Sequence, residues 1–463
     1  MSAPRILFLI LVAAVVVRVG LFAWVLVFGV GESITSYGDG KGYIELATNL
    51  AQGNGFVTLN QATQELEVQT LRAPGLPFLL APFTLFENGL VIYGFILAIL
   101  SGILLPFFTY HIGTRLFTNG PALIAAALVA FEPHMVWFSF VTLSEIPFLL
   151  AFMGGIYCVV LYRSTFSSAW IAAGLLLGSA VLIRPPFLPI FGILVIGTAA
   201  WSLMVRNSKL AQRIGILIAG IAIVLLPWSV RNFSHTGSFA ISAMGWYNLY
   251  FDYVSSIYVI EDGVDFGVEK NRRAENPPPG VPRSEIQSTT YSGHFRNAAL
   301  EEMWAHKGTV VKLESLLLFT FFTNDSYYYY LRRYGLIDER SLEKHTAASH
   351  SMLAQGMAGV RPVVDELMRQ RFIPIFGRVF TIIIVLLALW GLITHRRNQM
   401  VWLLAAMIGV TALVSTTLGL GVEARLRLPV QPLMFMLAGA GLYRVVLWYD
   451  YVRSRSSPRN SGA

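Results

Sequence analysis

The sequence predicts an all-α polytopic membrane protein with about ten transmembrane helices. Of its 463 residues, 55% are hydrophobic and only 13% are charged. Soluble domains usually carry about 25% charged residues. Many apolar runs reach the roughly 20 residues that a helix needs to cross a bilayer. The basic residues fall mainly in the loops between these runs, as the positive-inside rule describes for membrane proteins.

Ten apolar segments are the expected spans. They are residues 6–30, 89–110, 120–137, 144–162, 168–183, 186–204, 214–230, 373–394, 400–420 and 429–449. The first span follows a short basic start that contains Arg5, which is also the arrangement of a signal peptide. Its apolar stretch is too long for a signal peptide, so we expect an uncleaved first span.

An even number of spans places both termini on the same side of the membrane. The loops and tail on that side are basic and contain Arg115, Arg163, Arg206, Lys209, Arg213, Arg396, Arg397, Arg453, Arg455 and Arg459. Because basic loops stay in the cytoplasm, both termini are predicted to be cytoplasmic. The expected location is the inner (plasma) membrane of a bacterium.

Two polar segments, 31–76 and 231–371, then face outward. The predicted organisation is an N-terminal transmembrane module (1–230), the long outward loop (231–371), C-terminal spans (372–449) and a basic tail (450–463). The apolar stretch 316–322 in the long loop is too short to span and suits an interfacial helix.

The charge distribution argues against nucleic-acid binding, and the cysteine content gives no indication of redox chemistry. A net charge of +8 is compatible with nucleic-acid binding, but the basic residues do not cluster on one soluble module. Cys158 is the only cysteine, so the chain has no intrachain disulfide.

Arg18 lies within the first span, where a charge is costly and usually has a partner or a function. The sequence does not identify that partner, and a packing role is the alternative.

The first outward loop predicts a short amphipathic helix, because residues 43, 44, 47, 50 and 51 are apolar at helical spacing. Gly53 is a suitable C-terminal stop. Asp39 comes just before this helix. It is either a helix cap, for which Asp is a favoured residue, or a catalytic carboxylate at the membrane surface.

A second polar cluster lies between the third and fourth spans. Thr142 and Glu145 have the spacing of a capping box, so Glu145 also has a structural interpretation. Glu132 and His134 lie nearby, but this group lacks tight metal-ligand spacing, and no metal is predicted.

Five arginines lie at the outer ends of spans, on the side that the positive-inside rule depletes. They are Arg72, Arg184, Arg231, Arg425 and Arg427. A single one is explained by snorkelling to lipid headgroups. Several, at the ends of different spans, better fit a site that binds anionic oxygen, because guanidinium groups bind phosphate bidentately and stay charged.

Together these motifs resemble the GT-C superfamily of membrane glycosyltransferases, in particular its protein O-mannosyltransferase-like and lipid A aminoarabinose transferase-like branch. Six elements in the family order carry the resemblance: Asp39 with Tyr43, Ala47 and Gly53-Asn-Gly55; Arg72 to Pro77; Ser144-Glu145; Arg184-Pro185; Pro227 to Asn232; and Arg425 to Pro432. Many relatives have an acidic pair in the first loop, whereas Gly40 follows Asp39 here. A role that depends on such a pair is therefore not carried over.

The resemblance implies transfer of a sugar from a polyprenyl-phosphate carrier to a glycan, lipid or protein acceptor outside the cytoplasm, with inversion. Asp39 would be the base, and Glu145 would orient the donor or acceptor. The five outer arginines are candidates for binding the donor phosphate. Tyr43, Trp246 and Tyr247 are candidate sugar or acceptor contacts, although interfacial aromatic belts explain such residues equally well. No cofactor, metal or nucleic acid is expected, and the oligomeric state is left open.

Three other functions stay open. A flippase or transporter usually has ionisable residues near mid-membrane and paired repeats, whereas only Arg18 lies at such depth here. A lipid-linked glycan polymerase or ligase shares the outward arginines, and only the Asp39 motif argues against it. A non-catalytic scaffold explains the spans but not the polar clusters on one side.

Overall fold

The computed structural model describes residues 2–28, 38–60, 64–161, 167–325, 327 and 373–456. Each of the ten expected spans corresponds to a helix. These are α1 (Ala3–Val27), α5 (Gly89–Leu116), α6 (Asn119–Phe131), α8 (Glu145–Leu161), α9 (Ser167–Ile183), α10 (Phe187–Met204), α11 (Ser208–Thr236), α20 (Ile373–Thr394), α21 (Gln399–Ser415) and α22 (Gln431–Ser456).

Seven of these helices are long and apolar enough to cross a membrane, judged by length and composition over the described residues. The other three, α6, α8 and α9, are apolar but shorter. The chain is therefore an integral membrane protein with many apolar helices, and the expected number of ten full-length spans is reduced to seven plus these shorter helices.

The third expected span is shorter than predicted because the chain breaks at Pro133. A proline disfavours helical backbone at the preceding residue, and Glu132 is extended. A short helix, α7 (Pro133–Trp137), follows the break. The buried Arg18 donates to the carbonyl oxygens of Ala130 at 2.6 Å and Val129 at 3.1 Å, which would otherwise be unpaired at the end of α6. The end of α6 is thus the partner that the sequence left unidentified.

Small residues allow close packing within the bundle. Helix α9 packs between α8 and α11, and α20 packs against α22. A Cβ atom on Gly174 of α9 would lie 2.4 Å from the carbonyl oxygen of Leu217, and one on Gly391 of α20 would lie 2.0 Å from that of Leu437. Backbones approach this closely in membrane helix pairs where one partner is glycine.

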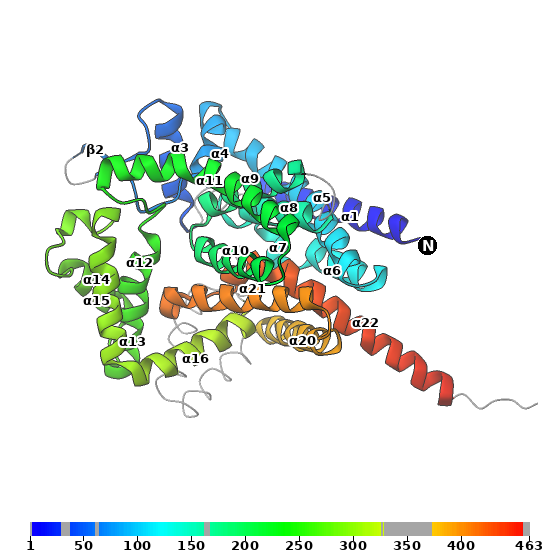
Figure 1. Ribbon diagram of the computed structural model, residues 1–463. Helices are drawn as coiled ribbons and strands as arrows, with labels where there is room; N and C mark the ends of the chain where they lie inside the picture. The colour runs from blue at the N-terminus through cyan, green and yellow to red at the C-terminus, as the bar shows by residue number, and fades with distance from the viewer. Residues whose placement is uncertain are drawn as a thin grey trace, which may run out of the picture.

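Both termini lie at one end of the bundle, whereas the polar segments gather at the other end (Figure 1). The first polar segment forms α3 (Gly40–Ala51), a hairpin of β1 (Val57–Leu59) and β2 (Leu66–Val68), α4 (Gly75–Leu80) and the 3₁₀ helix η1 (Ala81–Leu85). The amphipathic helix is confirmed, since α3 buries Leu46 and Ala47. The hairpin pairs Thr58 with Glu67 and is an exception to the expected all-α fold.

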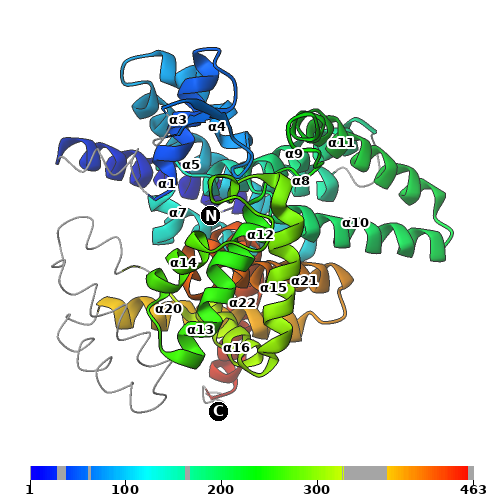
Figure 2. The ribbon, with the colours of Figure 1, turned by 90° about the vertical axis from the view of Figure 1, so that its left-hand side faces the viewer.

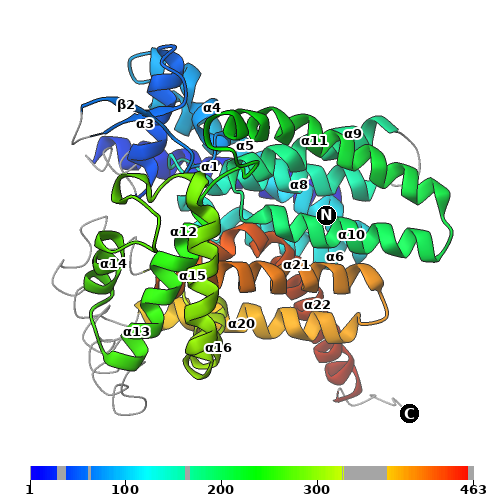
Figure 3. The same cartoon turned by 60° about the vertical axis from the view of Figure 1, so that its left-hand side comes forward.

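The late polar segment is also helical as far as the structure describes it. It contains α12 (Met244–Asn248), a π-helical turn η2 (Leu249–Tyr253), α13 (Val254–Asp262), α14 (Phe266–Glu275), 3₁₀ turns η3 (Arg283–Glu285) and η4 (Thr289–Tyr291), α15 (Ser292–Ala305) and α16 (Lys307–Thr323). Residues 316–322 belong to α16, as expected for part of a helix. Figures 2 and 3 show α12 to α15 beside α3 and α4 at the same end of the bundle. Residues 326 and 328–371 of the expected loop lie outside the described residues.

Candidate functional site

Five of the predicted site residues meet at the polar end of the bundle, and each comes from a different element. Asp39 precedes α3, Arg72 precedes α4, Glu145 is the first residue of α8, Arg184 follows α9, and Arg425 lies in the 3₁₀ helix η7 (Ala424–Val430) before α22. We call these five residues the charge cluster.

The charge cluster is a continuous chain of alternating charges. Arg72 Nη2 donates to Asp39 Oδ1 at 3.1 Å, and the other carboxylate oxygen of Asp39 lies 3.9 Å from Arg425 Nη2. Arg425 Nε lies 3.5 Å from Glu145 Oε1, which also accepts from Arg184 Nη1 at 2.9 Å. Three guanidinium groups and two carboxylates leave a formal charge of +1.

The two carboxylates of the cluster differ in exposure. The side chain of Asp39 is 46% exposed, whereas that of Glu145 is only 3% exposed. Burial by itself would raise the pKa of Asp39, but the nearby guanidinium groups of Arg72 and Arg425 outweigh it and hold this pKa below its usual value. Asp39 is therefore an ionised carboxylate that a ligand can reach.

Asp39 does not act as a helix cap, although it occupies the N-cap position of α3. Its side chain accepts no capping hydrogen bond and pairs with Arg72 instead. The guanidinium of Arg72 also lies over the ring of Tyr43, 5.0 Å from its centroid. A Cβ on Gly42 would lie 2.9 Å from Arg72 Nε. The sequence did not single out Gly42. Its only distinguishing feature there is that it is a small residue about one helical turn after Asp39.

Glu145 does not form the capping box suggested by its spacing from Thr142. Helix α8 begins at Glu145 itself, whereas a capping box needs the acidic residue three positions after the cap. Its carboxylate lies in the first helical turn, where the helix dipole favours a negative charge. The Arg184 guanidinium that pairs with it also donates to Ser144 Oγ at 3.3 Å.

A close backbone contact places Arg72 and Arg184 in the same region. A Cβ on Gly75, at the start of α4, would lie 2.6 Å from the backbone nitrogen of Ile183, the last residue of α9. Arg72 lies three residues before this contact, and Arg184 follows it directly. The glycine of the Arg-x-Pro-Gly element is therefore needed for helix packing beside the cluster.

The structure does not bring Arg231 and Arg427 into the charge cluster. Arg231 lies on α11, donates to the carbonyl oxygens of Gln69 at 3.0 Å and Phe56 at 3.1 Å, and stacks on Trp228. Arg427 is buried and donates to the carbonyl oxygens of Phe321 at 2.6 Å and Asn324 at 2.9 Å, at the end of α16. Both arginines hold backbone segments together.

The aromatic candidates also separate. Tyr43 lies beneath Arg72 in the cluster. Trp246 and Tyr247 lie on α12, where Trp246 is 39% exposed and the Tyr247 ring packs 4.4 Å from that of Phe251. No contact recorded among the described residues joins either of these two to the charge cluster.

A second polar group, the Glu132 cluster, consists of Glu132, His134 and Tyr327. Glu132 Oε1 lies 2.7 Å from His134 Nδ1 and accepts from the Tyr327 hydroxyl at 2.9 Å. The other carboxylate oxygen of Glu132 accepts from the backbone nitrogen of Met135 and caps α7. Within the described part of the chain, no group of three or more His, Cys, Asp or Glu residues could hold a metal ion.

Residues 72–230 match the model of a family described as dolichyl-phosphate-mannose-protein mannosyltransferase. The match confirms the resemblance to this family of GT-C membrane glycosyltransferases. It includes Arg72, Glu145 and Arg184 but begins after Asp39 and ends before Arg425. A comparison with curated protein sequences finds no match.

Three solved structures are similar over most of this chain. An oligosaccharyltransferase from Archaeoglobus fulgidus, in complex with Zn and sulfate, is 13% identical with a TM-score of 0.48, covering 96% of this chain and 50% of that one. AglB from the same organism, in complex with an inhibitory peptide and a dolichol-phosphate, is 12% identical with a TM-score of 0.49, covering 100% and 52%. ArnT from Cupriavidus metallidurans, bound to undecaprenyl phosphate, is 14% identical with a TM-score of 0.36, covering 96% and 81%. The chain thus spans about half the length of the two archaeal proteins, and TM-scores below 0.5 do not establish a shared fold.

Proposed function

Starting from the mannosyltransferase family to which residues 72–230 belong, we propose that this protein is a glycosyltransferase that uses a polyprenyl-phosphate-linked sugar as donor. The acceptor is a glycan, lipid or protein on the non-cytoplasmic side of the membrane. The observation that carries the proposal is the charge cluster, whose formal charge of +1 matches the single negative charge of a phosphodiester donor. Guanidinium groups are well suited to bind such a phosphate.

Two polar atoms in the cluster lack hydrogen-bond partners. Arg72 Nη1 and Glu145 Oε2 are buried, and neither has a hydrogen-bond partner among the described residues. A buried polar atom without a partner is costly. A donor phosphate beside Arg72, and a sugar or acceptor hydroxyl beside Glu145, would supply these bonds.

The reaction is a single displacement that inverts the anomeric centre. The acceptor oxygen forms a bond to the anomeric carbon as the bond between that carbon and the phosphate oxygen breaks. The electron pair goes to the phosphate, and the acceptor proton goes to the Asp39 carboxylate. The phosphate thereby gains one negative charge, which Arg72, Arg425 and Arg184 stabilise most strongly in the transition state.

Exposure assigns the two carboxylates different roles. Asp39 is half-exposed, so an acceptor hydroxyl can approach it, whereas the buried Glu145 is held by Arg184 and Arg425 and orients the ligands. Arg72 is paired with Asp39 in this structure. A donor phosphate that attracts Arg72 weakens this pair and makes Asp39 a stronger base when the donor is bound.

The arrangement of the chain supports an outward site. The end of the bundle that carries α3 lies opposite both termini (Figure 1). The basic loops and tail predict that the termini are cytoplasmic. The cluster beside α3 then faces the non-cytoplasmic side of a bacterial inner membrane.

A transfer assay with purified protein and a panel of polyprenyl-phosphate sugars tests the proposal. Asp39→Asn should lower kcat by about 10²- to 10⁴-fold, the usual contribution of a general base. The control is Glu87→Gln, an exposed carboxylate between η1 and α5. Wild-type turnover by a folded Asp39→Asn variant would remove Asp39 as the base. If no monophosphate-linked sugar is transferred and a pyrophosphate-linked glycan binds tightly, the polymerase or ligase function is favoured.

A further inference from the structure

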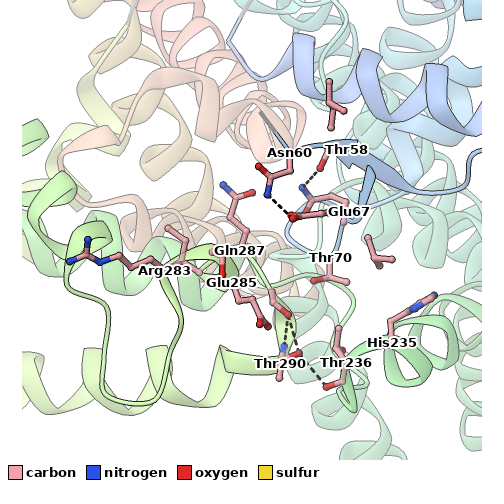
Figure 4. A pocket seen from close by; sticks show the side chains of 16 residues that line it. Thr58, Asn60, Glu67, Thr70, His235, Thr236, Arg283, Glu285, Gln287 and Thr290 are labelled. Atoms are coloured by element: carbon pink, nitrogen blue, oxygen red, sulfur yellow. Dashed lines mark hydrogen bonds between the residues drawn. The ribbon is translucent and has the colours of Figure 1, made fainter. Parts of the chain in front are cut away.

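A polar pocket of about 480 Å³ lies between the β1–β2 hairpin, the end of α11 and residues 283–290 (Figure 4). Its volume lies within the range of roughly 300–1,000 Å³ that is typical of small-molecule sites. Only three lining residues, Leu59, Val68 and Ile286, are aliphatic, and the others carry polar side chains. Ligand pockets are usually mainly apolar, so this lining suits an unusually polar ligand.

Hydrogen bonds between distant segments fix the walls of the pocket. The Thr70 hydroxyl accepts from the backbone nitrogen of Thr289 at 3.1 Å, and the hydroxyls of Thr236 and Thr289 lie 2.8 Å apart. Arg231 holds the carbonyl oxygen of Gln69 from the side of α11. The hairpin, α11 and the 283–290 segment are therefore held together before a ligand binds.

Several polar side chains of the lining are free to bind a ligand. His235, Arg283, Glu285 and Gln287 line the pocket, and among the described residues none of their side chains has a recorded hydrogen-bond partner. Figure 4 shows His235 on one side of the pocket and Glu285 and Gln287 on another, whereas the Arg283 side chain points away from them. A ligand with many hydroxyl groups can use both donors and acceptors, since each hydroxyl donates and accepts.

The charge of the pocket differs from that of the charge cluster. Its lining contains Glu67, Glu285 and Arg283, so its formal charge is −1 with His235 neutral. A phosphate or another anion is disfavoured there. The pocket is thus unsuited to the donor phosphate, and it fits a neutral polyhydroxylated molecule.

The pocket lies next to the charge cluster along the chain. Gln69 and Thr70 line the pocket, and Arg72 follows two residues after Thr70. Two residues span at most about 7 Å of extended chain. The pocket wall at Thr70 therefore lies beside the segment that carries Arg72 to its partner Asp39.

We propose that this pocket binds a neutral carbohydrate portion of the acceptor and so selects a glycan over a peptide or an anionic lipid headgroup. The inference rests on the proposed glycosyltransferase function, because it assigns the pocket to the acceptor of that reaction. It narrows the acceptor to a molecule with hydroxyl groups on several neighbouring sugars.

The test uses the purified full chain in detergent and saturation-transfer NMR with neutral di- to tetrasaccharides of common hexoses. The same spectra are recorded with a serine- and threonine-containing hexapeptide and with glycerol phosphate. The test variant is Glu285→Gln combined with Gln287→Ala, and the matched control is Glu301→Gln, an exposed carboxylate on α15 outside the pocket. We expect at least one oligosaccharide to bind, with affinity reduced about tenfold in the test variant and unchanged in the control.

Binding of no oligosaccharide, or binding that the test variant leaves unchanged, overturns the proposal. Displacement of the sugar by the hexapeptide or glycerol phosphate overturns it as well. Undecaprenyl phosphate binding is measured in the same samples and should be unaffected by the pocket substitutions. Oligosaccharide binding together with absent sugar transfer from every polyprenyl-phosphate donor would overturn the proposed function while leaving the carbohydrate site intact.

Discussion

The charge cluster and the Glu132 cluster both hold a carboxylate among hydrogen-bond donors, yet they differ in what reaches that carboxylate. Asp39 is half-exposed and pairs with arginines that lie on separate elements. Glu132 is 1% exposed at its side chain and is held by His134, Tyr327 and the start of α7. A fully buried and satisfied carboxylate stabilises the fold, whereas an exposed one that cations keep ionised can also react.

Among these changes, loss of Glu132 should have the largest effect, which is a decrease in the stability of the fold. Glu132→Ala removes the cap of α7 and takes away the carboxylate that the buried His134 and the half-buried Tyr327 contact. Breaking a buried pair in this way costs roughly 3–5 kcal/mol of unfolding free energy. Chemical unfolding in detergent measures it, with Glu87→Ala as the control. A variant as stable as wild type would mean that the Glu132 cluster is not structural.

Loss of Arg425 should instead affect turnover. Arg425→Ala removes the cation between Asp39 and Glu145, and we expect kcat to fall about 10²- to 10³-fold, as for loss of one group that stabilises transition-state charge. Single-turnover transfer from a polyprenyl-phosphate sugar measures it, with the exposed Arg296→Ala as the control. A fall in unfolding midpoint as large as that of Glu132→Ala would remove the contrast between the two clusters.

A smaller effect is expected from Gly42→Ala. The added Cβ would lie 2.9 Å from Arg72 Nε, so the guanidinium must shift from the position in which it pairs with Asp39. Because the far part of an arginine side chain moves easily, stability should change little, while the donor KM rises by about tenfold, or 1.4 kcal/mol. Gly245→Ala, where a Cβ meets nothing within 4 Å, is the control. An unchanged donor KM would show that the position of Arg72 does not matter for donor binding.

The smallest effect concerns pH. In the enzyme without donor, the arginines of Asp39 outweigh its burial and lower its pKa, so the carboxylate stays ionised as the pH falls from 7 to 5 and kcat/KM should stay nearly flat on this account. The ion pair stabilises the fold above the ordinary pKa of about 3.9, and this contribution is lost as the pH falls through the lowered value. Arg72→Ala should move the acid limb of the pH–rate profile to higher pH. An acid limb of kcat/KM already centred above pH 5 in wild type contradicts this assignment.

Local sequence was sufficient for much of the fold. The ten apolar segments, the amphipathic helix α3 and its stop before Gly53 all follow from hydrophobic spacing, and the structure has a helix at each place. Hydrophobic spacing failed at the ends of two helices. Pro133 ends the third expected span early, and α11 continues past Arg231 to Thr236 although the segment is polar there.

The sequence predicted every member of the charge cluster, but it could not tell them from outer arginines that lie elsewhere. The sequence offered all five members as candidates. Arg72, Arg184 and Arg425 were candidates because arginines are depleted on the outer side, and Asp39 and Glu145 were candidates because of their motifs. Arg231 and Arg427 had the same signal, yet in the structure they bind backbone carbonyl oxygens. No local pattern distinguishes these two groups of arginines.

The sequence by itself determined that this is a membrane protein, where its apolar helices lie and which charged residues are unusual, because apolar length and charge are local properties. Tertiary structure decided which charges meet. Arg425 and Arg427 lie two residues apart on η7, and in a helix of three residues per turn such side chains point in different directions. One reaches Asp39 and Glu145, and the other reaches the end of α16. The different partners of Arg425 and Arg427 result from how the elements around η7 pack, which the local sequence does not determine.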